Sequence, residues 1–287
     1  MTYRSMLFVP VLEERFIAKA HTRGADAVIL DLEDSIAPTA KARARAAVRG
    51  AAAEIAAKGV PTFVRVNHPG PLTGDDIVAA VGPHVAGLVI PKVESADEVR
   101  AVARAVEAAE RSSGRSGPPT VLVPVVETPA GLLHAEAIAR ADGRLAALAF
   151  GSEDFAAAME VEPKPETLAV PAQLVTIAAR AAGLAPLGLA GSIAEFRDAE
   201  AFAAVARHAR SVGFLGSPCI HPAQVPVLNA AFAPSPAEVD WAGRVVAAYD
   251  AALAEGRGAA SVDGRMIDVP VYERAKRVLA RAGAGAR

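Results

Sequence analysis

Short apolar runs alternate along the chain with longer stretches in which apolar residues recur at helical spacing. Eight runs are rich in branched and aromatic residues and are mostly continuous: residues 6–10, 27–33, 62–67, 86–92, 120–127, 145–151, 186–191 and 213–221. A continuous apolar run is typical of a strand that is buried on both faces, as in a parallel sheet. The stretches between them, such as residues 96–112 and 199–211, predict helices that cover this sheet.

Eight strands, most of them followed by a helix, predict an α/β fold of the (β/α)8 TIM-barrel type. The length of 287 residues suits a single barrel of this kind. We assign residues 1–222 to a catalytic barrel and residues 223–287 to a C-terminal helical extension. The extension exceeds what a barrel needs, so it is a candidate lid or subunit-contact arm. Helices that simply cover the bottom of the barrel are the alternative.

Composition and charge narrow the range of partners. The net charge is −2 and the basic residues are scattered singly, so we expect neither a nucleic acid nor a membrane surface as partner. A single cysteine, Cys219, excludes an internal disulfide framework. The first residues lack the pattern of a signal peptide, and no apolar segment reaches the roughly 18 residues that span a bilayer. These features predict a cytoplasmic protein.

Charged and polar side chains gather where the apolar runs end, which is where the active site of a barrel lies. They are Asp31, Glu33, Asp34, Arg65, Asn67, Lys92, Glu94, Glu127, Glu153, Asp154 and His221. Several have a structural alternative: Asp34 could cap the next helix, Lys92 could pair with an acid of a neighbouring strand, and His221 could belong to a turn. We expect the side chains at these strand ends to converge on one mouth.

Glu127 and Asp154 form the most specific pair in this set. They end adjacent predicted strands, and two carboxylates that approach closely repel each other unless they share a proton or a cation. Mg2+ takes one or two carboxylates together with waters and substrate oxygens, so the pair is a candidate metal site. Arg65 stands on an apolar strand, where it could pair with a protein acid such as Glu33, bind a substrate carboxylate, or do both.

Eight motifs in order make the chain resemble the citrate lyase beta-subunit-like family, in the larger HpcH/HpaI aldolase and malyl-CoA lyase group. They are "RSMLFVP", "ADAVILDLEDSI", "FVRVN", "GLVIPKVES", "VVETPAGL", "AFGSEDFA", "GFLGSPCIHPAQV" and "VDGRMIDVPV". The resemblance implies a Mg2+-dependent carbon–carbon lyase that cleaves or condenses a 3-hydroxyacyl-CoA such as malyl-CoA, citramalyl-CoA or citryl-CoA. The products of cleavage would be a 2-oxo acid and an acyl-CoA.

The family's site residues carry over by motif. Glu127 of "VVETPAGL" and Asp154 of "FGSEDF" take the positions of the Mg2+ ligands, and Glu127 thereby also faces the substrate. Arg65 of "FVRVN" resembles the catalytic arginine that holds the 2-oxo acid. Arg4 and Lys19 resemble positions near the CoA phosphates.

The resemblance also implies a homotrimer or hexamer in which the C-terminal segment closes over a neighbour's site. Asp268 takes the acidic position of that segment and is the candidate catalytic acid, with a cap of its own subunit's last helix as the alternative.

Three departures from the family pattern concern the CoA end of the site. The segment before "AARAAG" (residues 169–177) lacks the arginine that many members have there, the region around strand seven offers only Glu195 as an acid, and Ser217 stands where many members have lysine. A CoA-independent aldolase of 4-hydroxy-2-oxo acids therefore stays open, as does a barrel that binds a metabolite without catalysis.

Overall fold

The computed structural model describes residues 3–115 and 117–284. The chain divides after Phe232 into two compact units, which we describe separately. In the first unit, all eight apolar runs form strands: β1 Ser5–Pro10, β2 Ala27–Asp31, β3 Thr62–Arg65, β4 Gly87–Ile90, β5 Val121–Val126, β6 Ala147–Phe150, β7 Ala185–Gly188 and β8 Ser217–Cys219. Most strands end earlier than predicted, because the polar residues that follow them belong to turns and helix starts.

The strands are parallel and form one eight-stranded sheet in the order β7-β6-β5-β4-β3-β2-β1-β8. β1 pairs with both β2 and β8, so the first and last strands are neighbours. The sheet closes between β7 and β8, where Leu187 bridges Gly216. There Leu215 N donates to Pro186 O at 3.0 Å and Gly188 N donates to Gly216 O at 2.9 Å. The predicted TIM barrel is therefore confirmed, with a narrow seam between β7 and β8.

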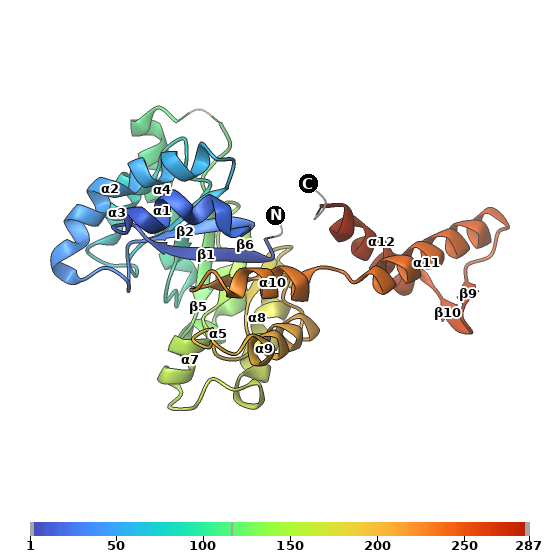
Figure 1. Cartoon of the computed structure of the whole chain (residues 1–287). Helices are drawn as coiled ribbons and strands as arrows, with labels where there is room; N and C mark the ends of the chain where they lie inside the picture. Colours follow the sequence, from blue (N-terminus) through green and yellow to red (C-terminus); the bar gives the residue numbers. More distant parts are fainter. Residues whose placement is uncertain (1–2, 116, 285–287) are drawn as a thin grey trace. The chain divides into compact units, whose positions relative to one another are not determined.

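Helices follow the strands and surround the sheet (Figure 1). They are α1 Glu14–Ala20, α2 Lys41–Ala56, α3 Thr73–Ala80, α4 Ala96–Ser113, α5 Pro129–Leu133, α6 Ala135–Ala139, α7 Ser152–Ala158, α8 Pro165–Ala181, α9 Ala199–Ser211 and α10 Gln224–Phe232, with short 3-10 turns at His21–Arg23 and Pro38–Ala40. Helix α4 begins with a capping box in which Ser95 accepts the N–H of Glu98.

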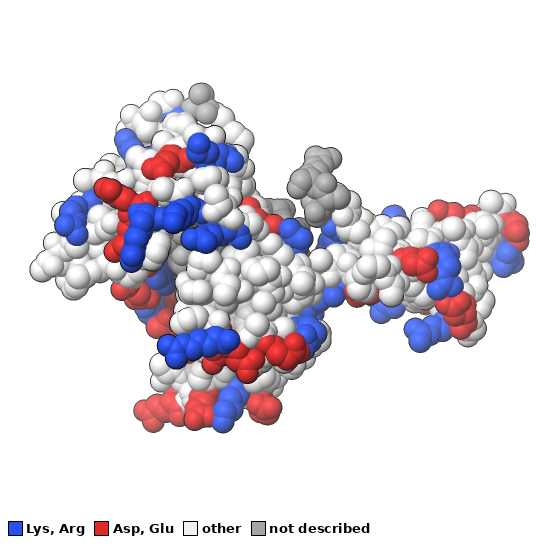
Figure 2. All heavy atoms as spheres, in the orientation of Figure 1, with Lys and Arg blue, Asp and Glu red and all other residues white. Residues whose placement is uncertain are grey.

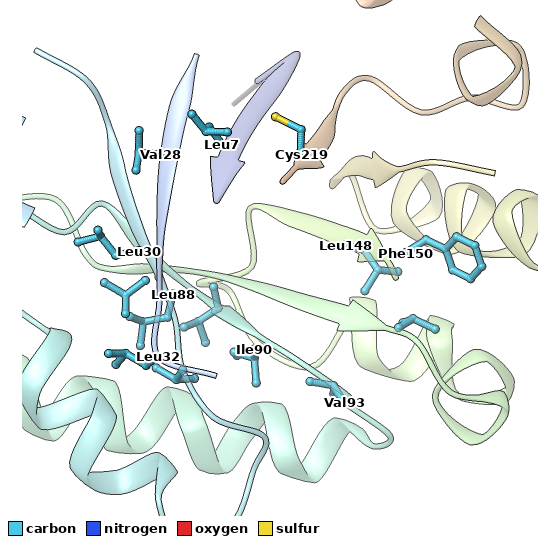
Figure 3. Packing of buried hydrophobic residues seen from close by; sticks show 14 of the residues in the cluster. Leu7, Val28, Leu30, Leu32, Leu88, Ile90, Val93, Leu148, Phe150 and Cys219 are labelled. Atoms are coloured by element: carbon cyan, nitrogen blue, oxygen red, sulfur yellow. The ribbon is translucent and has the colours of Figure 1, made fainter. Parts of the chain in front are cut away.

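Alternate residues along the strands contribute to two hydrophobic clusters, one inside the barrel and one between the sheet and the helices. Met6, Ile29, Phe63 and Val123 belong to a cluster that fills the barrel interior. Their sequence neighbours face outward and pack against the helices; Leu30, Leu88 and Ile90 lie on this side (Figure 3). Burial on both faces explains why the strand sequences are continuously apolar.

The second unit contains α11 Pro236–Ala254, a hairpin of β9 Ala260–Val262 and β10 Arg265–Ile267, and α12 Val269–Ala284. Asp263 and Gly264 form the hairpin turn with positive φ angles of 50° and 74°. The unit has its own small core around Ala242, Val245 and Tyr249. Its first helix has a well-defined start, because Ser235 caps α11 and Pro236 stands at its first position.

The division of the chain lies ten residues beyond the one expected from the sequence, after Phe232 and not after Pro222. Helix α10 belongs to the barrel unit because its Asn229 is hydrogen-bonded to residues near the first strand. Ser5 Oγ donates to Asn229 Oδ1 at 2.7 Å, and Asn229 Nδ2 donates to Gly24 O at 2.9 Å. The role of the following segment as a lid stays a prediction.

Surface chemistry agrees with the balanced composition. Basic and acidic side chains lie next to one another over much of the face shown in Figure 2. Within residues 3–115 and 117–284, no helix is both long and apolar enough to cross a membrane.

Candidate active site

A cavity of about 490 Å3 opens at the carboxyl ends of the strands. Its lining includes Arg65 of β3, Glu127 after β5 and Asp154 of α7, so the structure brings together three side chains that the sequence had singled out. Much of the remaining wall is apolar and includes Phe8 and Leu189. The cavity thus combines a few charged groups with a wall that limits water, as ligand sites commonly do.

Glu127 is placed by the backbone of two neighbouring segments. Its side chain is buried, at 5% exposure, and Oε1 accepts the N–H of Lys92 at 2.7 Å. Gly151 lies against Oε2 so closely that an added Cβ would overlap the carboxylate. Burial, and then the charge of Asp154, raise the pKa of Glu127 to about 8. The described side chains therefore do not fully compensate the negative charge of this carboxylate.

Asp154 stands in the first turn of α7 and is about half exposed, with Lys92 Nζ 3.7 Å from its Oδ1. Among the residues that the structure describes, no group of three or more acid, histidine or cysteine side chains is arranged around a metal position. Glu127 and Asp154 would therefore supply two oxygen ligands, and water or substrate would supply the others. This is the donor set that a hard cation such as Mg2+ accepts, and the uncompensated charge of Glu127 fits it.

Arg65 is held in a fixed plane by acids of β2 and the loop that follows it. Nε and Nη2 donate to the two oxygens of Asp31 at 2.7 and 2.8 Å. Nη1 lies 2.9 Å from Glu33 and 3.1 Å from Asp34. Nη2 carries two hydrogens and donates one of them to Asp31, which leaves the other for a ligand. The Phe8 ring lies 4.7 Å from the guanidinium carbon and completes its support.

The pairing of Arg65 with Glu33 was predicted and is confirmed, but Asp31 is the stronger partner and was missed. Burial opposes the charge of Arg65, and the hydrogen bond and charge of Asp31 outweigh it, so the pKa of Arg65 is raised. Asp31 and Arg65 are register partners in the parallel pair of β2 and β3. An acid at the last position of one strand beside an arginine at the end of the next was the available signal.

Lys92 follows β4 and lies among the acids of the mouth. Its Nζ is 3.0 Å from Glu33 Oε1, which confirms the predicted pairing with an acid of a neighbouring strand. Burial opposes its charge, yet the hydrogen bond to Glu33 and the charges of Glu33, Asp154 and Asp34 together raise the pKa of Lys92. Asp34 contacts Arg65 and Lys92 at 3.1 and 4.0 Å, so its carboxylate helps to neutralise these two cations.

Loop contacts around the mouth were not visible in the sequence. Gln224 is buried, and its Nε2 donates to Ile193 O at 2.7 Å while its Oε1 accepts the N–H of Ile220 at 3.0 Å. It thereby fastens the loop after β7 to the loop after β8. His221 has a turn role as well, because its Nδ1 accepts the N–H of Ala223 at 3.2 Å. A glutamine at the start of a helix carries no pattern that predicts such a link.

Three further candidates lie outside this cavity. Arg4 precedes β1 at the opposite end of the barrel, where its guanidinium makes two hydrogen bonds to Asp26, at 2.9 and 2.7 Å. Lys19 is an exposed residue in the last turn of α1. Asp268 belongs to the second unit, where its Oδ1 accepts the N–H of Val271 at 3.3 Å. The cap suggested as the alternative for Asp268 is therefore present within its own chain, and the proposed roles of all three residues stay predictions.

Comparison with known proteins identifies the family. The family model for HpcH/HpaI aldolase/citrate lyase matches residues 4–222. The chain is 36% identical over 284 residues to the citrate lyase subunit beta of Escherichia coli strain K12, covering 98% of this chain and 93% of that protein. It is 35% identical over 285 residues to a (3S)-malyl-CoA thioesterase of Cereibacter sphaeroides strain ATCC 17025, covering 98% and 95%.

A solved structure is similar over the same length. The protein CitE from Mycobacterium tuberculosis, in complex with magnesium, acetoacetate and coenzyme A, has a TM-score of 0.79 and 31% identity, with 98% of each chain covered. The resemblance found in the sequence motifs is thereby confirmed. This chain belongs to the HpcH/HpaI aldolase/citrate lyase family.

Proposed function

We propose that this protein is a Mg2+-dependent carbon–carbon lyase that cleaves, or forms by condensation, a 3-hydroxyacyl-CoA. The main observation behind the proposal is that Glu127, Asp154 and Arg65 line one cavity at the carboxyl ends of the barrel strands. Magnesium, a 3-oxo acid and coenzyme A in the similar CitE structure support it.

Several residues have separate roles at the carboxylate end of the substrate. Glu127 and Asp154 would hold Mg2+, which when bound supplies positive charge that favours loss of the hydroxyl proton and the 2-oxo acid product. Asp31 fixes the plane of Arg65, so that the remaining Nη2 hydrogen can bind the substrate carboxylate. Apolar side chains such as Leu189 and Phe150 limit access of water to the breaking bond.

Cleavage breaks the bond between the hydroxyl-bearing carbon and the carbon next to the thioester. The hydroxyl loses its proton, its carbon becomes the carbonyl of the 2-oxo acid, and the bonding electron pair passes to the thioester enolate. That enolate takes up a proton at carbon. We assign this proton donation to Asp268 of a neighbouring subunit in a homotrimer or hexamer.

Hydrolysis of the thioester is the second candidate, because a relative of similar identity is named a thioesterase. Malyl-CoA, methylmalyl-CoA, citramalyl-CoA, citryl-CoA and free 4-hydroxy-2-oxo acids should each be tested with Mg2+ and with excess chelator. Release of a 2-oxo acid without free CoA thiol indicates the lyase, and free thiol indicates the thioesterase. Release of pyruvate together with an aldehyde, from the free acids alone, indicates the CoA-independent aldolase. No Mg2+-dependent product from any of them would contradict an enzymatic function of this site.

The shared-site role of Asp268 makes a separate prediction. Asp268→Ala and Glu127→Gln chains should each be inactive alone, and a mixture should recover part of the activity, since some sites then combine an intact barrel with an intact tail. Activity should be measured on mixed oligomers whose composition has been verified. Asp263→Ala is the matched control, because Asp263 lies in the same hairpin but pairs with Arg244 at 2.8 Å. A fully active Asp268→Ala protein, or no recovery in the mixture, would contradict the shared site. Asp268 would then act only as the cap of its own chain's last helix.

A further inference from the structure

Lys92 contacts both carboxylates of the candidate metal site. Its backbone N–H donates to Glu127 Oε1 at 2.7 Å, and its ammonium lies 3.7 Å from Asp154 Oδ1. The residue has a φ of 52°, in the left-handed region that side chains other than glycine rarely adopt. Such backbone strain persists where the surroundings hold it in place, and here it turns the N–H toward the buried carboxylate.

The ammonium of Lys92 also has a second partner outside the metal pair. Its Nζ is closer to Glu33, at 3.0 Å, than to Asp154. Glu33 is buried and is held in turn by Arg65, whereas Asp154 is about half exposed. Lys92 can therefore give up Asp154 without becoming unpaired, because Glu33 remains beside it.

Arg65, the other cation that lies near these acids, pairs with carboxylates other than Asp154. Arg65 is bound to Asp31, Glu33 and Asp34. Among the ion pairs of the described residues, the one that reaches Asp154 comes from Lys92. A divalent cation between Glu127 and Asp154 would take the carboxylate that the Lys92 ammonium contacts.

We propose, on the basis of the Mg2+ site of the proposed function, that Lys92 is a positioning residue that acts as an internal counter-cation. In the metal-free protein its ammonium holds Asp154 beside Glu127. When Mg2+ binds, the ammonium gives up Asp154 and keeps Glu33. Lys92 thus keeps the two ligands together and at the same time weakens the binding of Mg2+, because two cations compete for one carboxylate.

The direction in which Mg2+ affinity changes when Lys92 is replaced distinguishes this role from a merely structural one. A residue that only supports the fold would weaken Mg2+ binding when it is replaced. Loss of a competing positive charge a few ångströms away should instead tighten it. Because the Lys92 side chain is 30% exposed and salt screens it, we expect a moderate change of about tenfold in the dissociation constant.

The test is calorimetric titration of the full-length, substrate-free protein with MgCl2 at low ionic strength. Lys92→Met should bind Mg2+ about tenfold more tightly than the wild type, and added salt should shrink the difference. Lys92→Arg keeps the charge and should stay within about threefold of the wild type. Lys41→Met is the matched control, since Lys41 Nζ donates to the carbonyls of Leu32 and Glu33, at 2.7 and 2.6 Å, and forms no ion pair with Asp154. Its Mg2+ affinity should equal that of the wild type.

Thermal unfolding provides a second readout. The metal-free Lys92→Met protein should melt at a lower temperature than the wild type, and saturating Mg2+ should remove most of the difference. Lys92→Gly removes the ammonium while accepting the positive φ, so it decides the question if Lys92→Met does not fold. Equal or weaker Mg2+ binding by the folded variants would overturn the role of Lys92 and leave the proposed function standing. Absence of Mg2+ binding by the wild type would overturn both.

Discussion

Glu127→Gln is expected to lower kcat/KM by about a thousandfold or more, because it removes one of the two carboxylates on which the proposed metal-assisted cleavage depends. The substitution keeps the size of the side chain and its acceptance of the Lys92 N–H. It also replaces a buried carboxyl group, whose pKa burial raises to about 8, with an amide that cannot ionise, so the metal-free protein should be at least as stable as the wild type. Mg2+ titration and circular dichroism measure the two effects separately.

Two further variants make this prediction specific. Asp154→Asn should weaken Mg2+ binding in the same way. Glu153→Gln is the matched control, because Glu153 lies in the same helical turn but accepts hydrogen bonds from Ser192 Oγ at 2.6 Å and Ile193 N at 2.9 Å. It should keep the Mg2+ affinity of the wild type. If both Glu127→Gln and Asp154→Asn bound Mg2+ normally, the metal site would have to lie elsewhere.

Arg65→Lys should lower kcat/KM by about a hundredfold, mainly through a higher KM for the 2-oxo acid in the condensation direction. Lysine keeps the positive charge but cannot bind both oxygens of Asp31 while donating to a substrate carboxylate from the same plane. Mg2+ affinity without substrate should stay near that of the wild type. Steady-state kinetics together with Mg2+ titration therefore separate loss of the substrate contact from loss of the metal.

Arg45→Lys provides the control for the structural part of this effect. Arg45 pairs with the fully buried Asp76 at 3.2 Å, and neither residue lines the cavity. Its replacement should lower the melting temperature without changing KM. An Arg65→Lys protein that behaved like Arg45→Lys would show that Arg65 supports the fold and does not bind substrate.

The barrel could be predicted because burial on both faces leaves a nearly continuous apolar run in most strands, including the short β7. The acids at the strand ends could be predicted for the same reason, since a charge after such a run stands out. The partner of Arg65 was harder, because Asp31 is 34 residues away and their contact depends on register. The position of α10 was harder still, since its link to Ser5 spans 224 residues.

The position of Arg4 in the barrel could be predicted from the topology, whereas its role near CoA stays a prediction. Arg4 stands before the first strand, and a residue before a barrel strand lies at the end opposite to the mouth. Topology alone could have separated it from Glu127 and Asp154. By contrast, the left-handed turn at Lys92 leaves no trace in the sequence, because lysine has no preference for that conformation.

The seam between β7 and β8 has a consequence for how the barrel fluctuates. Arg65, Glu127 and Asp154 stand on β3, directly after β5 and on α7, while the two backbone hydrogen bonds that close the seam involve residues 186–188 and 215–216. Transient opening of the barrel at this join would expose those amides to exchange with solvent. It would leave the pairing of β5 with β6, and hence the distance between the two acids, unchanged. The barrel can therefore open at this join, where Leu189 and Ser217 line the cavity, while the two acids keep their distance.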